Sequence, residues 1–236
     1  MLCEALLLGQ MEYQTAWDLQ AQLAAEVAAG ARPPALMLLE HPHTFTFGRR
    51  GNAKNLLWDE AEQTRRGVSV HWVDRGGDVT YHGPGQLVGY PILQLSGGDY
   101  VGYIRKLELT LVKTLARVGI VSGQVPGMAG VWVQPDVASR CLHCPPAARK
   151  LPSKIASVGV KVDANGVSRH GFALNIRTDP AYWQGIVGCG LEGYPVINAA
   201  DLLTEAPELE AVIDRLLTSF DEVFGYSMRV IDRWKV

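Results

Sequence analysis

The chain has 236 residues, of which 47% are hydrophobic and 19% charged, and its formal net charge is −2. This balance is typical of a globular protein with a sizeable core, and it lacks the basic surplus of a nucleic-acid-binding protein. The chain has no apolar stretch long enough to span a membrane, and its first ten residues lack the basic leader of a secretory signal. Because four sparsely placed cysteines fit a reducing compartment, we expect a cytoplasmic protein that binds neither nucleic acid nor membrane.

The apolar pattern predicts a single domain over residues 1–236. Apolar runs predict strands at residues 2–8, 35–39, 69–73, 87–95, 131–133, 154–162 and 171–176. Helical spacing or strong helix-forming composition predicts helices at residues 12–29, 103–118 and from Pro207 onward. Since strands and helices mix without strict alternation, we expect an α/β (α+β) sheet with packed helices. The segments that contain Lys154 and His170 should occupy neighbouring strands.

The run RGGDVTYHGPGQ at residues 75–86 is the most informative segment. Its four glycines and one proline predict a loop rather than a regular helix or strand. The same run holds guanidinium, carboxylate, phenol and imidazole groups, which is more polar chemistry than a turn requires. We therefore expect this segment to bring backbone amides and side chains close to a ligand.

The cysteines and one lysine are candidates for covalent chemistry. Cys3 lies in the first predicted strand and fits a small buried hydrophobic residue. Cys189 lies between Gly188 and Gly190, which would let a substrate approach closely, although a packed structural thiol remains open. Lys154 begins a segment of apolar and small residues, where an amine loses hydration; a lysine that reaches back to solvent is the alternative. Lys161, seven positions on, should lie on the opposite strand face.

Residues 135–152 contain a Cys-x-x-Cys formed by Cys141 and Cys144, with His143 between them. These three residues are one ligand short of a structural zinc site, so a disulfide or a plain mobile loop is favoured and no metal is expected. Because the segment directly precedes Lys154, we hypothesise that it acts as a lid or as a docking surface for a carrier protein.

Five ordered segments resemble the motifs of the octanoyl-[acyl-carrier-protein]:protein N-octanoyltransferases, also called lipoyl(octanoyl) transferases. In chain order they are EHPHTFTFGR at 40–49, RGGDVTYHGPGQLVGYP at 75–91, KIASVGV at 154–160, HGFALN at 170–175 and CG at 189–190. The resemblance implies the fold of biotin protein ligase catalytic domains, a mixed sheet flanked by helices with a smaller second sheet. Two departures are a glycine at 188, where the family usually has proline, and a longer link at 135–152. The first predicts a more mobile cysteine loop, and the second indicates a loop insertion.

The resemblance implies an enzyme that moves an octanoyl group from octanoyl-acyl carrier protein, through a thioester on Cys189, to a specific lysine. The acceptors would be lipoyl domains of 2-oxoacid dehydrogenases and the glycine-cleavage carrier protein. Lys154 would stabilise the thiolate as an ammonium and take a proton from the attacking lysine as an amine, and no cofactor is required. The substrate-lining residues that it implies are Arg75, Gly76, Gly77, Asp78, Val79, Thr80, Tyr81, His82, Ser157, Val158, Gly159, Gly171, Phe172 and Ala173.

Several roles stay open at this point. His82 could orient the thioester or hold its own loop, while His170 and Asn175 are weaker candidates. An ATP-dependent lipoate- or biotin-protein ligase of the same fold is the alternative function, and a non-catalytic carrier-binding domain is another. Lipoate ligases have a His-Asp-x-Gly-Asn type run where this chain has residues 82–86, and they need no cysteine nucleophile. The sequence also lacks a Gly-x-x-x-x-Gly-Lys-Ser/Thr phosphate loop.

Overall fold

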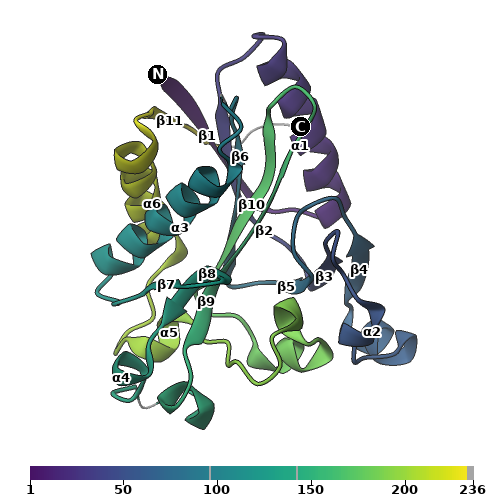
Figure 1. The fold of residues 1–236 in the computed structure, drawn as a ribbon, viewed down its shortest axis with the longest axis vertical. Helices are drawn as coiled ribbons and strands as arrows, with labels where there is room; N and C mark the ends of the chain where they lie inside the picture. Colours follow the sequence, from purple (N-terminus) through teal and green to yellow (C-terminus); the bar gives the residue numbers. More distant parts are fainter. Residues whose placement is uncertain (96, 142, 233–236) are drawn as a thin grey trace.

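An eight-stranded sheet forms the centre of the protein (Figure 1). The structure is a computed structural model that describes residues 1–95, 97–141 and 143–232, with only the backbone at Cys189 and Asp232. The strand order is β11-β1-β2-β6-β10-β9-β8-β7, in which β1 runs parallel to β2 and β11 and the other pairs are antiparallel. The strands are β1 (Leu2–Gln10), β2 (Ala35–Glu40), β6 (Gln86–Ile92), β7 (Gly123–Val125), β8 (Met128–Val133), β9 (Ser153–Val162), β10 (Ser168–Asn175) and β11 (Ser227–Asp232).

A second, three-stranded sheet lies beside the first. It contains β3 (Thr44–Phe47), β4 (Ser69–Trp72) and β5 (Val79–His82) in the order β4-β3-β5. Its own apolar core is formed by Phe45, Phe47, Val79, Tyr81 and Ile186. The predicted fold class, a mixed sheet with helices and a smaller second sheet, is therefore confirmed.

Helices cover both faces of the large sheet. Helix α1 (Tyr13–Ala28) packs on one face, and α3 (Tyr100–Arg117) and α6 (Leu209–Phe224) pack together on the other, where Figure 1 shows them apart from α1. The shorter helical segments are η1 (Ala53–Asn55), α2 (Glu60–Arg66), α4 (Pro135–Ala138), η2 (Pro146–Arg149), η3 (Pro180–Gly185), η4 (Gly188–Gly190) and α5 (Ala199–Leu202). None of the helices in the described ranges is long and apolar enough to cross a bilayer.

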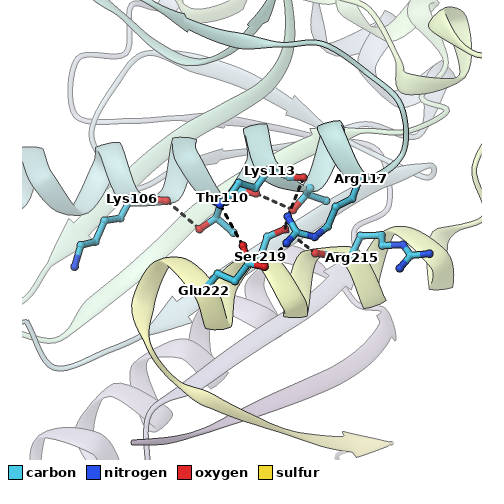
Figure 2. A network of polar contacts seen from close by, with 8 residues as sticks. Lys106, Thr110, Lys113, Arg117, Arg215, Ser219 and Glu222 are labelled. Atoms are coloured by element: carbon cyan, nitrogen blue, oxygen red, sulfur yellow. Dashed lines mark hydrogen bonds and ion pairs between the residues drawn. The ribbon is translucent and has the colours of Figure 1, made fainter.

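Polar side chains join α3 to α6 at the protein surface (Figure 2). Glu222 pairs with Lys113 at 3.2 Å and with Arg117, whose guanidinium also donates to the Ser219 hydroxyl at 3.3 Å. Exposed pairs of this kind each contribute less than about 1 kcal/mol, so the buried apolar faces of the two helices provide most of the stability of this contact.

The structure confirms some predicted elements and corrects others. Strands β9 and β10 form the expected hairpin, with His170 opposite Val160 and Ala173 opposite Ser157. The prediction that the run at 75–86 is entirely loop is wrong, because residues 79–82 form β5, which pairs with β3. These four residues are β-branched or aromatic apart from the last, and such side chains favour a strand despite the glycines on both sides.

Candidate active site

A cavity of about 390 Å³ lies where the small sheet meets β8, β9 and β10. Most of the residues predicted to contact substrate line it, together with Lys154. They are Arg75, Gly76, Gly77, Asp78, Thr80, His82, Ser157, Val158, Gly159, Gly171, Phe172 and Ala173. The structure therefore brings together three segments that are separated by up to 98 positions in the sequence, from Arg75 to Ala173.

Val79 and Tyr81 are the two predicted substrate residues that do not line this cavity. Successive side chains of a strand alternate between its faces, so β5 presents Thr80 and His82 to the cavity and these two residues to the other side. Both are buried in the core of the small sheet, and the Tyr81 hydroxyl contacts Nδ1 of His43 at 2.9 Å. Their placement assigns them to packing within the small sheet.

The glycine segment at residues 75–78 is held by the chain that follows β3. The amides of Arg49 and Arg50 donate to the carbonyls of Arg75 and Gly77 at 2.9 and 3.0 Å. The Arg75 guanidinium is buried and donates to the carbonyl and hydroxyl of Thr46 at 2.6 and 2.9 Å. These bonds fix the backbone of this cavity wall.

Gly48→Ala should distort this wall. A Cβ at Gly48 would lie 2.5 Å from the Gly77 carbonyl oxygen and 2.8 Å from the Arg75 guanidinium, so the glycine segment must shift. We expect a loss of about 1–3 kcal/mol in the free energy of unfolding, which urea denaturation would measure. Gly123→Ala is the matched control, because a Cβ there has no neighbour within 4 Å. Equal stability of the two variants would contradict the close approach.

His82 is buried and electrically neutral. Its Nδ1 lies 2.8 Å from Oε1 of Gln86, and because an amide oxygen can only accept, Nδ1 carries the proton. Nε2 then accepts from the Thr46 hydroxyl at 3.3 Å. Burial, followed by the nearby His41, places the pKa of His82 well below its usual value. The structure thus shows His82 in hydrogen bonds that hold its own segment.

His41 belongs to the same buried cluster of rings, 5.7 Å from the His82 ring. Its Nδ1 donates to the Met11 carbonyl at 2.7 Å, and its Nε2 accepts from the Tyr90 hydroxyl at 2.7 Å. Burial lowers the pKa of His41 to about 4. This residue links α1, β2 and β6 behind the cavity wall.

Folding should lose stability in mild acid because of His41. In the unfolded chain its pKa is about 6.5, so the unfolded state binds the proton first as pH falls from about 6.5 to about 4. Neutral His41 therefore contributes fully to the free energy of unfolding above about pH 6.5. About 3 kcal/mol of this contribution is lost as the pH falls to about 4. Urea unfolding at several pH values should show this slope, and His41→Gln should make it shallower, while the buried His82 keeps its own part of the slope. Parallel curves for the two proteins would contradict the assignment.

His170 lies in β10 with an unusual backbone angle, φ = 55°, which non-glycine residues rarely adopt. Its amide donates to Oε1 of Gln20 at 2.7 Å, and its Nε2 contacts Asp74 at 2.8 Å. The side chain lines the cavity, as do Tyr13 and Tyr90, which the sequence did not single out. Asn175, the other weak candidate, does not line it and accepts from the Gln86 amide at 2.9 Å.

Lys154 is 5% exposed and lies on the cavity wall near the start of β9. Its Nζ is 4.7 Å from the centre of the Trp132 ring, within the range of a cation–π contact. Its backbone bonds to the chain that follows Cys189, since the Lys154 amide donates to Pro195 at 2.8 Å and its carbonyl accepts from Ile197 at 3.0 Å. The segment that contains Cys189 is thereby tied to the lysine strand.

Cys189 lies in η4, but its side chain is outside the described part of the structure. The backbone around it is placed, with the Val187 amide donating to Asn55 at 2.9 Å and the Gly190 amide to Val187 at 3.0 Å. Gly190 and Leu191 line the same cavity as Lys154, and Gly188 lines a smaller one beside it that Lys154 also lines. The residues on both sides of Cys189 therefore lie near the lysine.

Cys141 and Cys144, in the connection between β8 and β9, are joined by a disulfide, one of the alternatives that the sequence left open. Both are buried against the main core, and neither lines the cavity. Among the described residues, no group of three or more His, Cys, Asp or Glu side chains could hold a metal ion.

Comparison with known proteins places the chain in a family. The lipoyl protein ligase A/B catalytic domain matches residues 12–221. The chain is 43% identical over 225 residues to an octanoyltransferase of Chloroflexus aurantiacus, covering 94% of each protein. It is 42% identical over 223 residues to an octanoyltransferase of Solibacter usitatus, covering 94% of this chain and 92% of that one.

Solved structures support the fold. A bi-partite lipoate protein ligase of Thermoplasma acidophilum matches with a TM-score of 0.70 at 16% identity, covering 100% of this chain and 89% of that one. Biotin protein ligase of Aquifex aeolicus matches with a TM-score of 0.52 at 11% identity, covering 94% and 70%. At these identities the likeness concerns the fold alone, while the sequence relatives define the family. The chain therefore belongs to the lipoyl protein ligase A/B catalytic domain family and, within it, to the lipoyl(octanoyl) transferases.

Proposed function

We propose that this enzyme transfers an octanoyl group from octanoyl-acyl carrier protein, through a thioester on Cys189, to a specific lysine of lipoyl domains. Octanoyl transfer in protein lipoylation is supported by the two octanoyltransferases that match over more than nine-tenths of the chain. The observation that carries the proposed mechanism is the cavity shared by Lys154 and the backbone on both sides of Cys189. The whole chain would act as one catalytic domain, with residues 135–152 as an addition to it.

The first half-reaction is a thioester exchange. The Cys189 thiolate attacks the carbonyl carbon, a new sulfur–carbon bond forms, and the bond to the carrier sulfur breaks. The departing carrier thiolate would take a proton from the Lys154 ammonium, which leaves Lys154 as the amine that the second half-reaction needs. Because one thioester replaces another, the step is nearly neutral in energy and needs neither ATP nor a cofactor. The Lys154 ammonium would stabilise the thiolate, which is otherwise a minor form of a free cysteine at neutral pH.

The second half-reaction forms the amide. The acceptor lysine attacks the thioester on Cys189, its nitrogen loses a proton to the Lys154 amine, and Cys189 leaves as a thiolate. The acceptors that we propose are lipoyl domains of 2-oxoacid dehydrogenases and the glycine-cleavage carrier protein, in the cytoplasm.

Of the proposed contact residues, Gly76, Gly77, Gly159 and Gly171 would leave room for the acyl chain, and Val158, Phe172 and Ala173 would provide its apolar walls. Arg75, Asp78, Thr80, His82 and Ser157 would form the polar part of the site. Val79 and Tyr81 would support it from behind.

Mass spectrometry after mixing with octanoyl-acyl carrier protein tests this proposal. We expect one octanoyl group on the peptide that contains Cys189 without ATP, and its transfer when a lipoyl domain is added. Acylation of the lipoyl domain that requires ATP and leaves Cys189 unmodified would favour a ligase. No acyl group on either protein, with or without ATP, would favour a non-catalytic binding domain.

A further inference from the structure

Glu108 is a buried carboxylate that the proposed chemistry does not use. It lies in the middle of α3, and its side chain is 0% exposed. One carboxylate oxygen pairs with the Arg105 guanidinium at 2.7 Å, and the other accepts the backbone N–H of Gly130 at 2.8 Å. Burial of a charge costs free energy even when the charge is paired, so the carboxylate needs an explanation beyond stability.

Gly130 lies close to the Lys154 side chain. Its φ of 109° lies in the region that favours glycine, and a Cβ built there would lie 2.5 Å from the Ala156 carbonyl oxygen and 3.5 Å from Cε of Lys154. The lysine side chain therefore passes close to the position that a side chain at residue 130 would occupy. The three residues before it, 127–129, line the cavity.

The sheet is irregular at this position. Val131 is opposite Ala156, whereas Trp132 is opposite Lys154, so Ile155 is an extra residue on β9. Such bulges interrupt the ladder of hydrogen bonds and redirect nearby side chains. The described register of β8 against β9 begins at Val131, and the Gly130 amide bonds to α3 through Glu108.

We propose that Glu108 is a positioning residue for acyl transfer. By accepting the Gly130 N–H, it fixes β8 at Gly130, and this backbone holds Lys154 against Trp132 beside the Cys189 loop. The inference rests on the proposed function, because it assigns Glu108 to the lysine that would activate Cys189. A charged acceptor makes a stronger bond to the amide than a neutral one, which explains why a carboxylate is found here.

Removal of the acceptor should slow the chemistry. Glu108→Ala leaves a buried N–H without its partner, so Gly130 should shift and displace the lysine. A displacement of this kind should lower kcat by about 10- to 100-fold with little change in KM for the lipoyl domain. Glu108→Gln retains an oxygen that can accept the N–H, so it should recover most of kcat.

Two matched controls separate positioning from general loss of stability. Thr110→Ala alters another fully buried side chain of α3, whose hydroxyl donates to the Lys106 carbonyl at 2.9 Å (Figure 2), and it should retain kcat. Gly130→Ala should reproduce the loss of kcat even if Glu108→Ala does not fold, and Gly123→Ala should retain kcat. Equal kcat in Glu108→Ala and Thr110→Ala would overturn the proposal. Equal losses of kcat in Glu108→Gln and Glu108→Ala would also overturn it.

A second readout does not depend on octanoyl transfer. The pH dependence of Cys189 alkylation by iodoacetamide reports how strongly the lysine favours the thiolate. We expect the profile to move to higher pH in Glu108→Ala and to stay near wild type in Glu108→Gln. Unchanged profiles in both variants would overturn the positioning role. Wild-type protein that alkylates normally but never accepts octanoyl would instead contradict the proposed function.

Discussion

Cys189→Ala is expected to lower octanoyl transfer by a factor on the order of 10⁴, because the variant has no atom that can carry the acyl group. The fold should be retained, since Cys189 lies in the short helical turn η4 rather than in either sheet. Single-turnover assays with octanoyl-acyl carrier protein and a lipoyl domain would measure the loss, and mass spectrometry should find no acyl-enzyme.

Cys3→Ala is the matched control for this experiment. Cys3 is a buried cysteine in β1 that belongs to the main core, where burial raises the pKa of its thiol to about 12. A thiol of this kind is a poor nucleophile, so its removal should cost stability but not transfer. Transfer that survives in Cys189→Ala and is lost in Cys3→Ala would reject the assignment.

Lys154→Met is expected to lower transfer by a factor on the order of 10³, because it removes both the cation beside the thiolate and the proton acceptor. Lys154→Arg separates these roles, since arginine retains the charge but cannot accept a proton at neutral pH. The arginine variant should therefore load octanoyl onto Cys189 faster than the methionine variant, yet pass it on slowly. Rapid-quench measurements of loading and transfer would resolve the two steps.

Lys161→Ala provides the comparison for the lysine variants. Lys161 is on the same strand, pairs with Arg169 in the register of β9 and β10, and does not line the cavity. Its removal should leave both steps within about twofold of wild type. Equal losses in the Lys154 and Lys161 variants would show that strand integrity, rather than the amine at 154, controls the rate.

Motif order was sufficient to predict which segments meet, because each segment has a distinctive combination of small and polar residues. The lysine segment and the His-Gly segment were predicted on neighbouring strands, and β9 and β10 pair directly. The direction of each side chain was harder to predict. The sequence predicts that all of residues 75–82 line the site, yet the last four form a strand that presents Val79 and Tyr81 to the core of the small sheet.

Residues that reach the cavity only through long-range strand pairing could hardly be recognised in the sequence. Tyr13 on α1 and Tyr90 on β6 belong to no recognisable motif, and only the folded protein brings them to the cavity. Glu108 did carry a signal, because it lies four positions after Ile104 and three before Leu111 in the apolar stripe of the predicted helix. A carboxylate on a buried helix face requires a partner, and here the partner is the backbone of Gly130.

Contact between the Cys189 sulfur and the Lys154 amine is the central requirement of the proposed mechanism. Treatment with o-phthalaldehyde tests it directly, because this reagent forms a fluorescent isoindole when a thiol and an amine lie next to each other. We predict a single isoindole that peptide mapping assigns to Cys189 and Lys154, absent from Cys189→Ala and Lys154→Met and present in Lys161→Ala. No isoindole in the folded wild-type enzyme, or one that joins Cys189 to a different lysine, would contradict the account.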